Sequence, residues 1–334
     1  MTEAADIVET LKARGFLAPD ATPQFQSLPG GVSSDVFRLD TAQGAVCVKR
    51  ALAQLRVAAD WRAPVERSHY EVEWLKTARA FVGDRVPQVL FEDQAASLFV
   101  MSFYDPATHS VWKTDLAEGR VDAGFAGQVG SLLAAVHAGA AGSAEIAGRF
   151  QTTPLFEDLR LQPFLRHCAE AHADLADRLV GLADRTAATR VTLVHGDVSP
   201  KNILHGPSGP VLLDAECAWY GDPAFDLAFC SAHLLLKTVW KPPHARGYLA
   251  AFAALHRAYL GAATWEDPTA LEARAAELTA AVVLARVDGK SPADYLRTDD
   301  DRGLVRAAAR RLVAATPPTM NGLAAAWRDH LGAR

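Results

Sequence analysis

The stretch Leu193-Val-His-Gly-Asp-Val-Ser-Pro-Lys-Asn-Ile-Leu204, followed by Val211-Leu-Leu-Asp-Ala-Glu216, decides the fold of this chain. An apolar run ends at a tight turn, and behind it Asp197 and Asn202 stand five residues apart. A Gly- and Pro-rich connection then leads to a second apolar run that ends in Asp214. This pattern predicts two short strands joined as a hairpin, which would hold the polar side chains at a fixed spacing.

Phosphoryl transfer from ATP needs side chains of these types. A carboxylate must hold and deprotonate the attacking hydroxyl, and an amide oxygen with a second carboxylate must hold Mg²⁺. We therefore predict Asp197 as the catalytic residue and Asn202 and Asp214 as metal ligands, with Glu216 assisting through the metal shell. A surface turn capped by Asp197 is the simpler alternative, but it does not explain a pattern that extends over about thirty residues.

The loop His195-Gly-Asp197 with Asp214-Ala-Glu216 behind it resembles the aminoglycoside phosphotransferase and choline kinase branch of the kinase-like fold. The segment 214–226 is particularly similar to methylthioribose kinases. The resemblance implies a two-lobed α+β fold, with a small antiparallel-sheet N-lobe and a larger, mainly helical C-lobe. It also implies that His195 and Asp226 support the catalytic loop. Protein kinases differ, because they carry H-R-D and D-F-G at these places.

The first third of the chain has the pattern of a nucleotide-covering lobe. After a short helix at 3–14, strands are predicted over 25–28, 35–39 and 45–49. We expect the turn behind the first strand to contact ATP phosphates through backbone N–H groups, although the family usually has an asparagine near Ser34. The residues concerned are Gly30, Gly31, Ser33 and Ser34. Lys49, at the end of the third strand, would reach the α- and β-phosphates.

A helix with an apolar stripe is predicted over 64–82. Glu71 borders this stripe, so we expect it to face inward and pair with Lys49. Glu73 is the rival partner. The motif Glu66-Arg67-x-x-x-Glu71 also resembles methylthioribose kinases, and its simpler explanation is a surface pair between Arg67 and Glu71.

Two further strands, over 87–91 and 97–102, should complete the sheet. The second would lead into a hinge where Met101, Ser102 and Phe103 present backbone groups to adenine. Asp105-Pro106 then ends the strand. The predicted division is an N-lobe over 1–102, a hinge over 103–106 and a C-lobe over 107–334.

The C-lobe is predicted to be mostly helical. Helices are expected over 125–137, 168–182, 223–237, 247–262, 268–287, 300–315 and 320–331, with a loop over 238–244. Asp222 is the expected N-cap of the third of these helices.

The family builds its acceptor pocket from helices of this lobe, which makes several charged residues candidate substrate contacts. They are Lys201, Arg286, Asp288 and Lys290. Gly289-Lys290-Ser291 looks like the end of a P-loop, but position 284 is Leu where the motif requires Gly. The run Asp299-Asp-Asp301 fits a helix N-terminus better than a metal site.

Composition narrows the class of protein. The chain has 334 residues, 22% of them charged, and a net charge of −5 without a long basic run, so a nucleic-acid partner is not expected. No apolar run is long enough to span a bilayer, and the acidic amphipathic N-terminus does not resemble a signal peptide. The four cysteines are widely spaced, as in reduced cytosolic proteins. We expect a cytoplasmic monomer or homodimer that acts on a small molecule.

The sequence therefore predicts an ATP- and Mg²⁺-dependent kinase that phosphorylates a hydroxyl of a small molecule. A sugar, an amino alcohol and an aminoglycoside all remain possible acceptors, with methylthioribose as a specific alternative. In methylthioribose kinases the position of Asn202 tends to differ, whereas Asn202 follows the general family pattern. A nucleotide-binding pseudokinase is the alternative of another class, but no residue of the signature is missing. The preference between ATP and GTP and the biological role, metabolic or resistance, are open.

Overall fold

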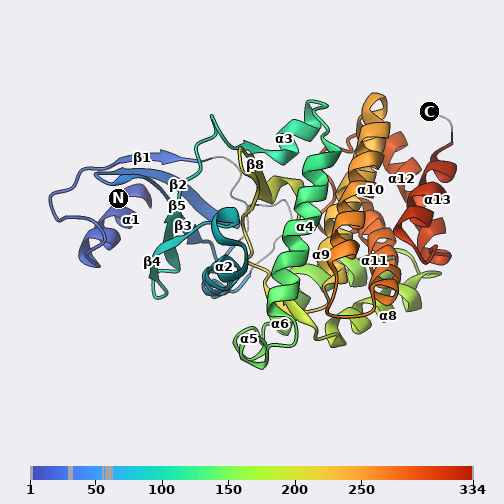
Figure 1. The fold of residues 1–334 in the computed structure, drawn as a ribbon, viewed down its shortest axis with the longest axis horizontal. Helices are drawn as coiled ribbons and strands as arrows, with labels where there is room; N and C mark the ends of the chain where they lie inside the picture. Colours follow the sequence, from blue (N-terminus) through green and yellow to red (C-terminus); the bar gives the residue numbers. More distant parts are fainter. Residues whose placement is uncertain (1–2, 29–32, 55, 57–62, 333–334) are drawn as a thin grey trace.

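The computed structural model describes residues 3–28, 33–54, 56 and 63–332. A sheet lobe carries the N-terminus at one end, and a larger helical part carries the C-terminus at the other (Figure 1). This arrangement confirms the predicted fold class.

The strands are β1 Gln24–Ser27, β2 Ser34–Thr41, β3 Gly44–Ala51, β4 Val89–Asp93, β5 Leu98–Ser102, β6 Ser110–Val111, β7 Thr192–Val194, β8 Ile203–Gly206, β9 Gly209–Leu212 and β10 Trp219–Gly221. The α-helices are α1 Glu3–Ala13, α2 Arg67–Val82, α3 Trp112–Ala117, α4 Ala123–Ala140, α5 Ala144–Arg149, α6 Thr153–Phe156, α7 His167–Ala171, α8 Ala176–Ala188, α9 Ala224–Trp240, α10 Ala245–Ala262, α11 Pro268–Asp288, α12 Asp299–Ala314 and α13 Met320–Leu331.

The five-stranded antiparallel sheet has the order β1-β2-β3-β5-β4. Side chains alternate between the two faces along a strand, so β3 divides its residues between two cores. Val46 and Val48 pack in a cluster with residues of α1, whereas Cys47 belongs to the main core, which includes α2. Lys49, two residues beyond Cys47, shares its face. The period of the strand thus directs Lys49 toward α2.

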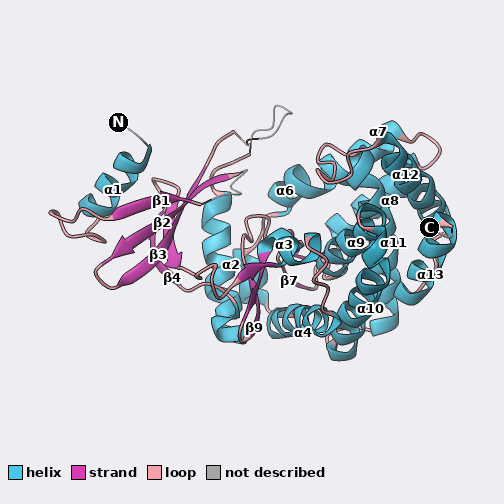
Figure 2. Cartoon of the chain, turned by 90° about the horizontal axis from the view of Figure 1, so that it is seen from above, coloured by secondary structure: helices cyan, strands magenta, loops and turns pink. Residues whose placement is uncertain are grey.

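Helix α2 lies between the sheet and the helical part (Figure 2). Val72, Trp74, Leu75 and Ala78 are buried in the main core. Glu71 is on the same buried side of the helix. The helix begins three residues later than predicted, at Arg67.

The helical part is built around α4, α9, α10 and α11, which contribute a large share of the main core (Figure 1). Helix α4 approaches α10 closely at Gly130, where a Cβ atom would lie 2.2 Å from the carbonyl oxygen of Leu255. Only glycine permits that approach. Asp222 accepts a hydrogen bond from the N–H of Ala224 (3.0 Å), but the N-cap position of α9 is Pro223, one residue later than predicted.

The predicted catalytic hairpin is formed by β8 and β9, with Ile203 opposite Leu212 and Gly206 opposite Gly209. At its open end the N–H of Leu213 donates to the carbonyl of Asn202 (2.9 Å). This bond brings the residues before β8 and behind β9 side by side.

Two predictions about the helical part are wrong. The single helix expected over 168–182 is divided into α7 and α8, with an irregular link between them. It is preceded by a π-helical segment, Glu157–Arg166, that contains Pro163. A proline lacks the N–H of a regular helix and crowds the preceding turn, which accounts for a wider helix here. The expected loop at 238–244 is helical as far as Trp240, because Val239 stays in the core.

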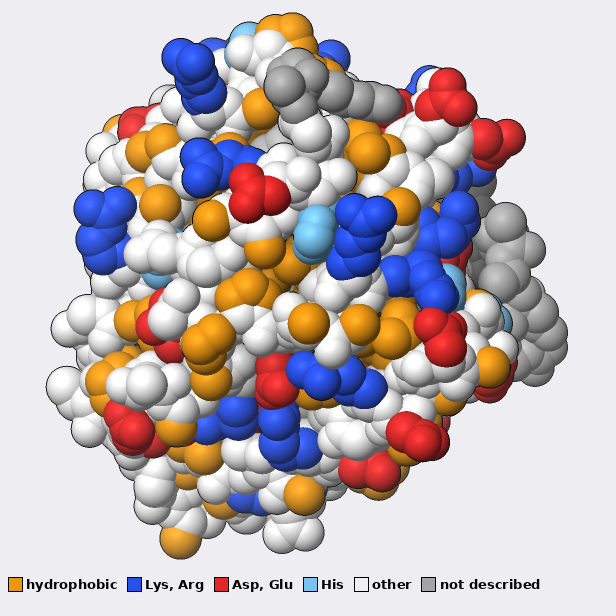
Figure 3. Space-filling model, turned by 90° about the vertical axis from the view of Figure 1, so that its right-hand side faces the viewer, with side chains coloured by type: hydrophobic (Ala, Val, Ile, Leu, Met, Phe, Trp, Pro, Cys, Tyr) orange, Lys and Arg blue, Asp and Glu red, His pale blue; other side chains and the backbone are white. Residues whose placement is uncertain are grey.

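On the face shown in Figure 3, basic and acidic side chains are interspersed instead of gathering by sign. The four cysteines are buried free thiols. Among the described residues, no helix combines the length and the apolar character that crossing a bilayer would require.

Candidate active site

The loop behind β7 is held in place by Asp226 of α9. Its carboxylate accepts hydrogen bonds from the backbone N–H groups of His195 and Gly196, both at 2.8 Å. His137 contacts the same carboxylate at 3.1 Å. Gly196 has a φ of 79°, and a Cβ atom there would lie 2.6 Å from the carbonyl oxygen of Cys217. The turn therefore requires glycine at this position.

Both ring nitrogens of His195 form hydrogen bonds with the backbone near the loop. Nε2 lies 3.0 Å from the carbonyl oxygen of Leu213, and Nδ1 lies 3.2 Å from the N–H of Asp197. The first contact needs a protonated nitrogen and the second an unprotonated one, so the ring is neutral. Burial, which outweighs the nearby carboxylates, lowers the pKa of His195. This geometry is that of a supporting residue.

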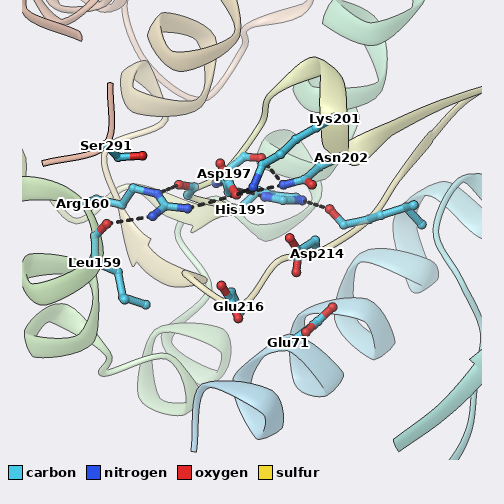
Figure 4. Close-up of polar contacts among 12 residues, drawn as sticks. Glu71, Leu159, Arg160, His195, Asp197, Lys201, Asn202, Asp214, Glu216 and Ser291 are labelled. Atoms are coloured by element: carbon cyan, nitrogen blue, oxygen red, sulfur yellow. Dashed lines mark hydrogen bonds and ion pairs between the residues drawn. The ribbon is translucent and has the colours of Figure 1, made fainter. Parts of the chain in front are cut away.

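Asp197 lies at the centre of the site (Figure 4). Its Oδ2 accepts a hydrogen bond from Nδ2 of Asn202 (2.9 Å) and forms ion pairs with Lys201 and Arg160, each at 3.1 Å. The residue is 4% exposed. Three donors thus stabilise the ionised carboxylate in one orientation.

Arg160 was missed by the sequence analysis. It belongs to the π-helical segment, where its Nε donates to the carbonyl of Gly196 (2.6 Å) and its Nη1 to that of Leu159 (2.7 Å). It therefore binds both the backbone and the carboxylate of the catalytic loop. The signal in the sequence is weak: Pro163 indicates an irregular helix here, but it does not indicate where the arginine points.

The predicted metal ligands lie next to Asp197. Asp214 has a φ of 67°, an unusual value for a residue other than glycine, and such strain is concentrated at functional sites. Burial opposes its charge, but Lys49 and Lys201 outweigh that and hold the pKa of Asp214 well below its usual range. Among the described residues, none donates a hydrogen bond to Oδ1 of Asn202. An ionised carboxylate and an available amide oxygen are ligands that Mg²⁺ accepts, so the donor set fits this ion.

The predicted ion pair between Lys49 and Glu71 is present. The two oxygens of Glu71 lie 2.8 and 2.7 Å from Nζ of Lys49, which also contacts Asp214. Burial disfavours the charged lysine, but Asp214, and then Glu71, outweigh it and raise the pKa of Lys49. Glu73 instead pairs with Lys76 and Arg149 at the surface.

Arg67 is not the surface residue that the simpler explanation of its motif required. It is completely buried, and its Nε donates to Glu216 (3.0 Å). Its other nitrogens donate to the carbonyl oxygens of Ser33 (2.5 Å), Leu52 (2.6 Å), Pro64 (2.8 Å) and Ala63 (3.1 Å). One guanidinium thus joins the turn before β2, the link after β3 and the residue predicted to assist the metal.

Residues 24–265 match the family model described as the phosphotransferase enzyme family. The chain belongs to this family. Its curated relatives include the methylthioribose kinase of Yersinia enterocolitica, which is 28% identical over 262 residues and is matched over 70% of this chain and 65% of its own length. The methylthioribose kinase of Erwinia tasmaniensis is 26% identical over 264 residues, with the same coverage. The chain thus spans slightly less than two thirds of these relatives.

Solved structures with the same fold include a choline/ethanolamine kinase family protein from Mesorhizobium loti (18% identity, TM-score 0.53, 98% of this chain and 99% of that one). An amicoumacin kinase is 13% identical with a TM-score of 0.57, covering 96% and 98%. The aminoglycoside phosphotransferase APH(4)-Ia is 15% identical with a TM-score of 0.52, covering 94% and 99%. These likenesses concern the fold alone.

The nucleotide contacts predicted in the sheet lobe are placed in part. Gly30 and Gly31 lie outside the described residues, while Ser33, just before β2, and Ser34, at its start, are buried. Met101 and Ser102 end β5, and the N–H of Ser102 donates to the carbonyl of Gln88 (2.9 Å). That N–H is therefore not free to bind adenine. Phe103 follows, with the guanidinium of Arg38 5.1 Å from its ring centroid.

The four residues predicted to contact the substrate are not all near Asp197. Lys201 lies near Asp197 and forms an ion pair with it. Arg286 lies against the ring of Phe164, which Arg160 also contacts, each with its guanidinium carbon 5.9 Å from the centroid. Asp288 is instead engaged by His172 and Arg306 (2.9 and 2.6 Å), and Lys290 is exposed at the end of α11.

Proposed function

We propose that this protein transfers the γ-phosphoryl group of ATP to a hydroxyl of a small molecule. The observation that carries the proposal is the convergence of Asp197, Asn202 and Asp214 with the buried pair of Lys49 and Glu71. Transfer of a phosphoryl group depends mainly on positioning and on charge stabilisation, and these residues supply both. Residues 103–106 would act as the hinge between lobes 1–102 and 107–334, and a cytoplasmic location would provide ATP.

In the proposed reaction, the acceptor oxygen forms a bond to the γ-phosphorus while the bond from that phosphorus to the bridging oxygen of ADP breaks. Asp197 orients the attacking hydroxyl and accepts its proton. Lys49 binds the α- and β-phosphates and is held in position by Glu71. Asp214 and Asn202 would hold Mg²⁺, which neutralises charge on the phosphates when bound. The amicoumacin kinase of the same fold was solved with AMP-PNP and Ca²⁺, a pairing consistent with this assignment.

Arg160 and Arg67 have positioning roles in this proposal. Arg160 orients Asp197 and, with Lys201, provides positive charge at the place where the γ-phosphoryl group would pass. Arg67 keeps Glu216 and the turn at Ser33 at a constant separation. Methylthioribose is a specific candidate acceptor, because the curated relatives are named methylthioribose kinases.

The test is ADP release with ATP or GTP over a panel of hydroxylated metabolites and aminoglycosides, methylthioribose included, in the presence of Mg²⁺. We expect at least one acceptor to be phosphorylated. The thermal shift produced by ATP should also depend on the metal: it corresponds to about 2.7 kcal/mol at a hundredfold excess over Kd and should fall with EDTA or in Asp214→Ala. ATP binding without any acceptor turnover would instead favour a nucleotide-binding regulator.

A further inference from the structure

Helix α9 carries a row of side chains that leads away from the catalytic loop. Asp226, Phe229, His233 and Lys237 follow one another at spacings of three and four residues, so they lie along one face of the helix. Asp226 holds the loop, and the ring of Phe229 lies 5.6 Å from the guanidinium of Arg160. His233 packs on Phe229 (5.5 Å between centroids). The row extends about 16 Å along the helix axis from Asp226 to Lys237, and Arg160 links it to Asp197 at Phe229.

Lys237, at the end of this row, is a buried cation. It is 1% exposed and makes no ion pair with any residue in the described part of the chain. Its ammonium lies over the rings of Tyr295 (4.4 Å) and Trp240 (4.9 Å). Burial, and then the charge of Lys113, lower the pKa of Lys237 to about 8.

Arg286 of α11 is a second cation in this region. Its Nη1 donates to the carbonyl and hydroxyl oxygens of Ser291, while its buried Nε has no hydrogen-bond partner among the residues that the structure describes. Arg286 lies close enough to Lys237 to disfavour its charge. Asp294 is a nearby carboxylate that favours the charged forms of both cations, but its ion pair is with Lys113 (3.1 Å).

His233 lies between these cations and Asp197. Its Nδ1 is 3.4 Å from the hydroxyl of Tyr295, which also contacts Lys237 through its ring. Burial, followed by the charges of Arg286 and Lys237, holds the pKa of His233 well below its ordinary value. A neutral imidazole can donate or accept a hydrogen bond, so it suits a polar ligand without adding charge.

Interior cations that form no ion pair destabilise a fold, and a bound anion would offset that cost. We propose that the acceptor is a hydroxylated anion, whose carboxylate or phosphate group binds Arg286 and Lys237 while its hydroxyl lies at Asp197. This inference rests on the proposed function. The anionic group would complete the ion pairs that the protein leaves open, and the distance between the two ends would select the length of the acceptor. Aminoglycosides, which are polycations, would be repelled.

The test uses matched acceptors that differ in one charged group. Ribose 5-phosphate is compared with ribose for the phosphate, and gluconate with glucitol for the carboxylate. Binding is measured by calorimetry and phosphorylation by ADP release, in the wild type, Lys237→Met, Arg286→Met and the control Lys241→Met. Lys241 is a suitable control because it contacts the same Trp240 ring (4.9 Å) from the next turn of the chain.

We expect at least one anion to bind roughly tenfold or more tightly than its neutral counterpart, because an ionic hydrogen bond contributes about that much. The preference should disappear in Lys237→Met and Arg286→Met and persist in Lys241→Met. Lys237→Met should also unfold at a higher temperature than the wild type, which a merely structural lysine would not allow.

Two results would overturn the inference. Either neither anion is preferred in the wild type, or the preference survives in Lys237→Met. Failure of the proposed function looks different, because anions would then bind in a manner that depends on Lys237 while no acceptor is phosphorylated. Turnover of methylthioribose or an aminoglycoside at a rate unaffected by Lys237→Met would support the proposed function and reject the anionic acceptor.

Discussion

The two ends of the site treat buried charge in opposite ways. At the nucleotide end, Lys49 is paired with Glu71 and Asp214, and Arg67 with Glu216. At the proposed acceptor end, Lys237 and Arg286 make no ion pair with a described residue, although Lys237 is buried and Arg286 is half-buried. A nucleotide end with its own ion pairs is ordered before any ligand binds. At the proposed acceptor end, the unpaired positive charges would be paired by the bound acceptor. Their sign therefore indicates an anionic acceptor.

The largest effect is expected at Asp197, where the two ends meet. Asp197→Asn removes the proton acceptor and should lower kcat by roughly a thousandfold, in the range found for general bases. Nucleotide binding should change little, because the contacts of Lys49 and Asp214 with one another do not involve Asp197. ADP release and the thermal shift with ATP measure these two quantities. A variant that keeps a tenth of wild-type turnover would show that the catalytic residue is another one.

The ion pairs at the proposed nucleotide end can be tested by substituting Arg67. Arg67→Met removes one buried charge and leaves Glu216 and several carbonyl groups without their donor, so we expect a loss of about 3 kcal/mol in the free energy of unfolding. Arg79→Met, on the exposed part of the same helix, is the matched control and should cost much less. Denaturant titration measures both. In a Glu216→Gln background the effect of Arg67→Met should shrink, and simple additivity would argue against the pairing.

The unpaired charge of Lys237 can be tested through the pH dependence of stability. Lys237 has its pKa lowered from 10.5 to about 8, so between these values the unfolded chain binds more protons than the native protein. Stability should therefore rise with pH across this window, by roughly 3 kcal/mol at most. The neighbouring His233 and Tyr295 do not titrate there, because burial lowers the pKa of the first and raises that of the second beyond the window. Relative to Lys237→Met, the wild type should be least stable below pH 8. Parallel stability curves for the two proteins would contradict this.

The smallest expected effect is on turnover, and it distinguishes Glu71 from Glu73 on α2. Glu71→Gln weakens the hold on Lys49 and should lower turnover by about tenfold, because positioning supplies much of the rate enhancement. Glu73→Gln should have little effect, since its partners Lys76 and Arg149 lie at the surface. Steady-state kinetics of both variants decide the matter. If the two exchange behaviour, the inward-facing glutamate has been misassigned.

The sequence was sufficient for the parts of the site whose residues are neighbours in the chain or share a regular period. Asn202 and Asp214 flank one hairpin, and Asp197 lies five residues before Asn202, so their spacing in the sequence largely determines their spacing in space. Lys49 and Glu71 were predictable because strand and helix periods place each on an inward face. The sequence did not predict the interruption of the helix expected over 168–182 or the helical start of the loop expected over 238–244. These features depend on Pro163 and on core packing around Val239.

Only the tertiary structure decided which distant residues complete the site. Arg160 reaches the loop from 36 residues before Gly196, and Arg67 reaches Glu216 across 149 residues. Lys237 and Arg286 come together because α9 packs against α11. No local period encodes such meetings, because they depend on how whole helices cross. An arginine or lysine in a helix is ordinarily solvated, and burial alone identifies the few that are not.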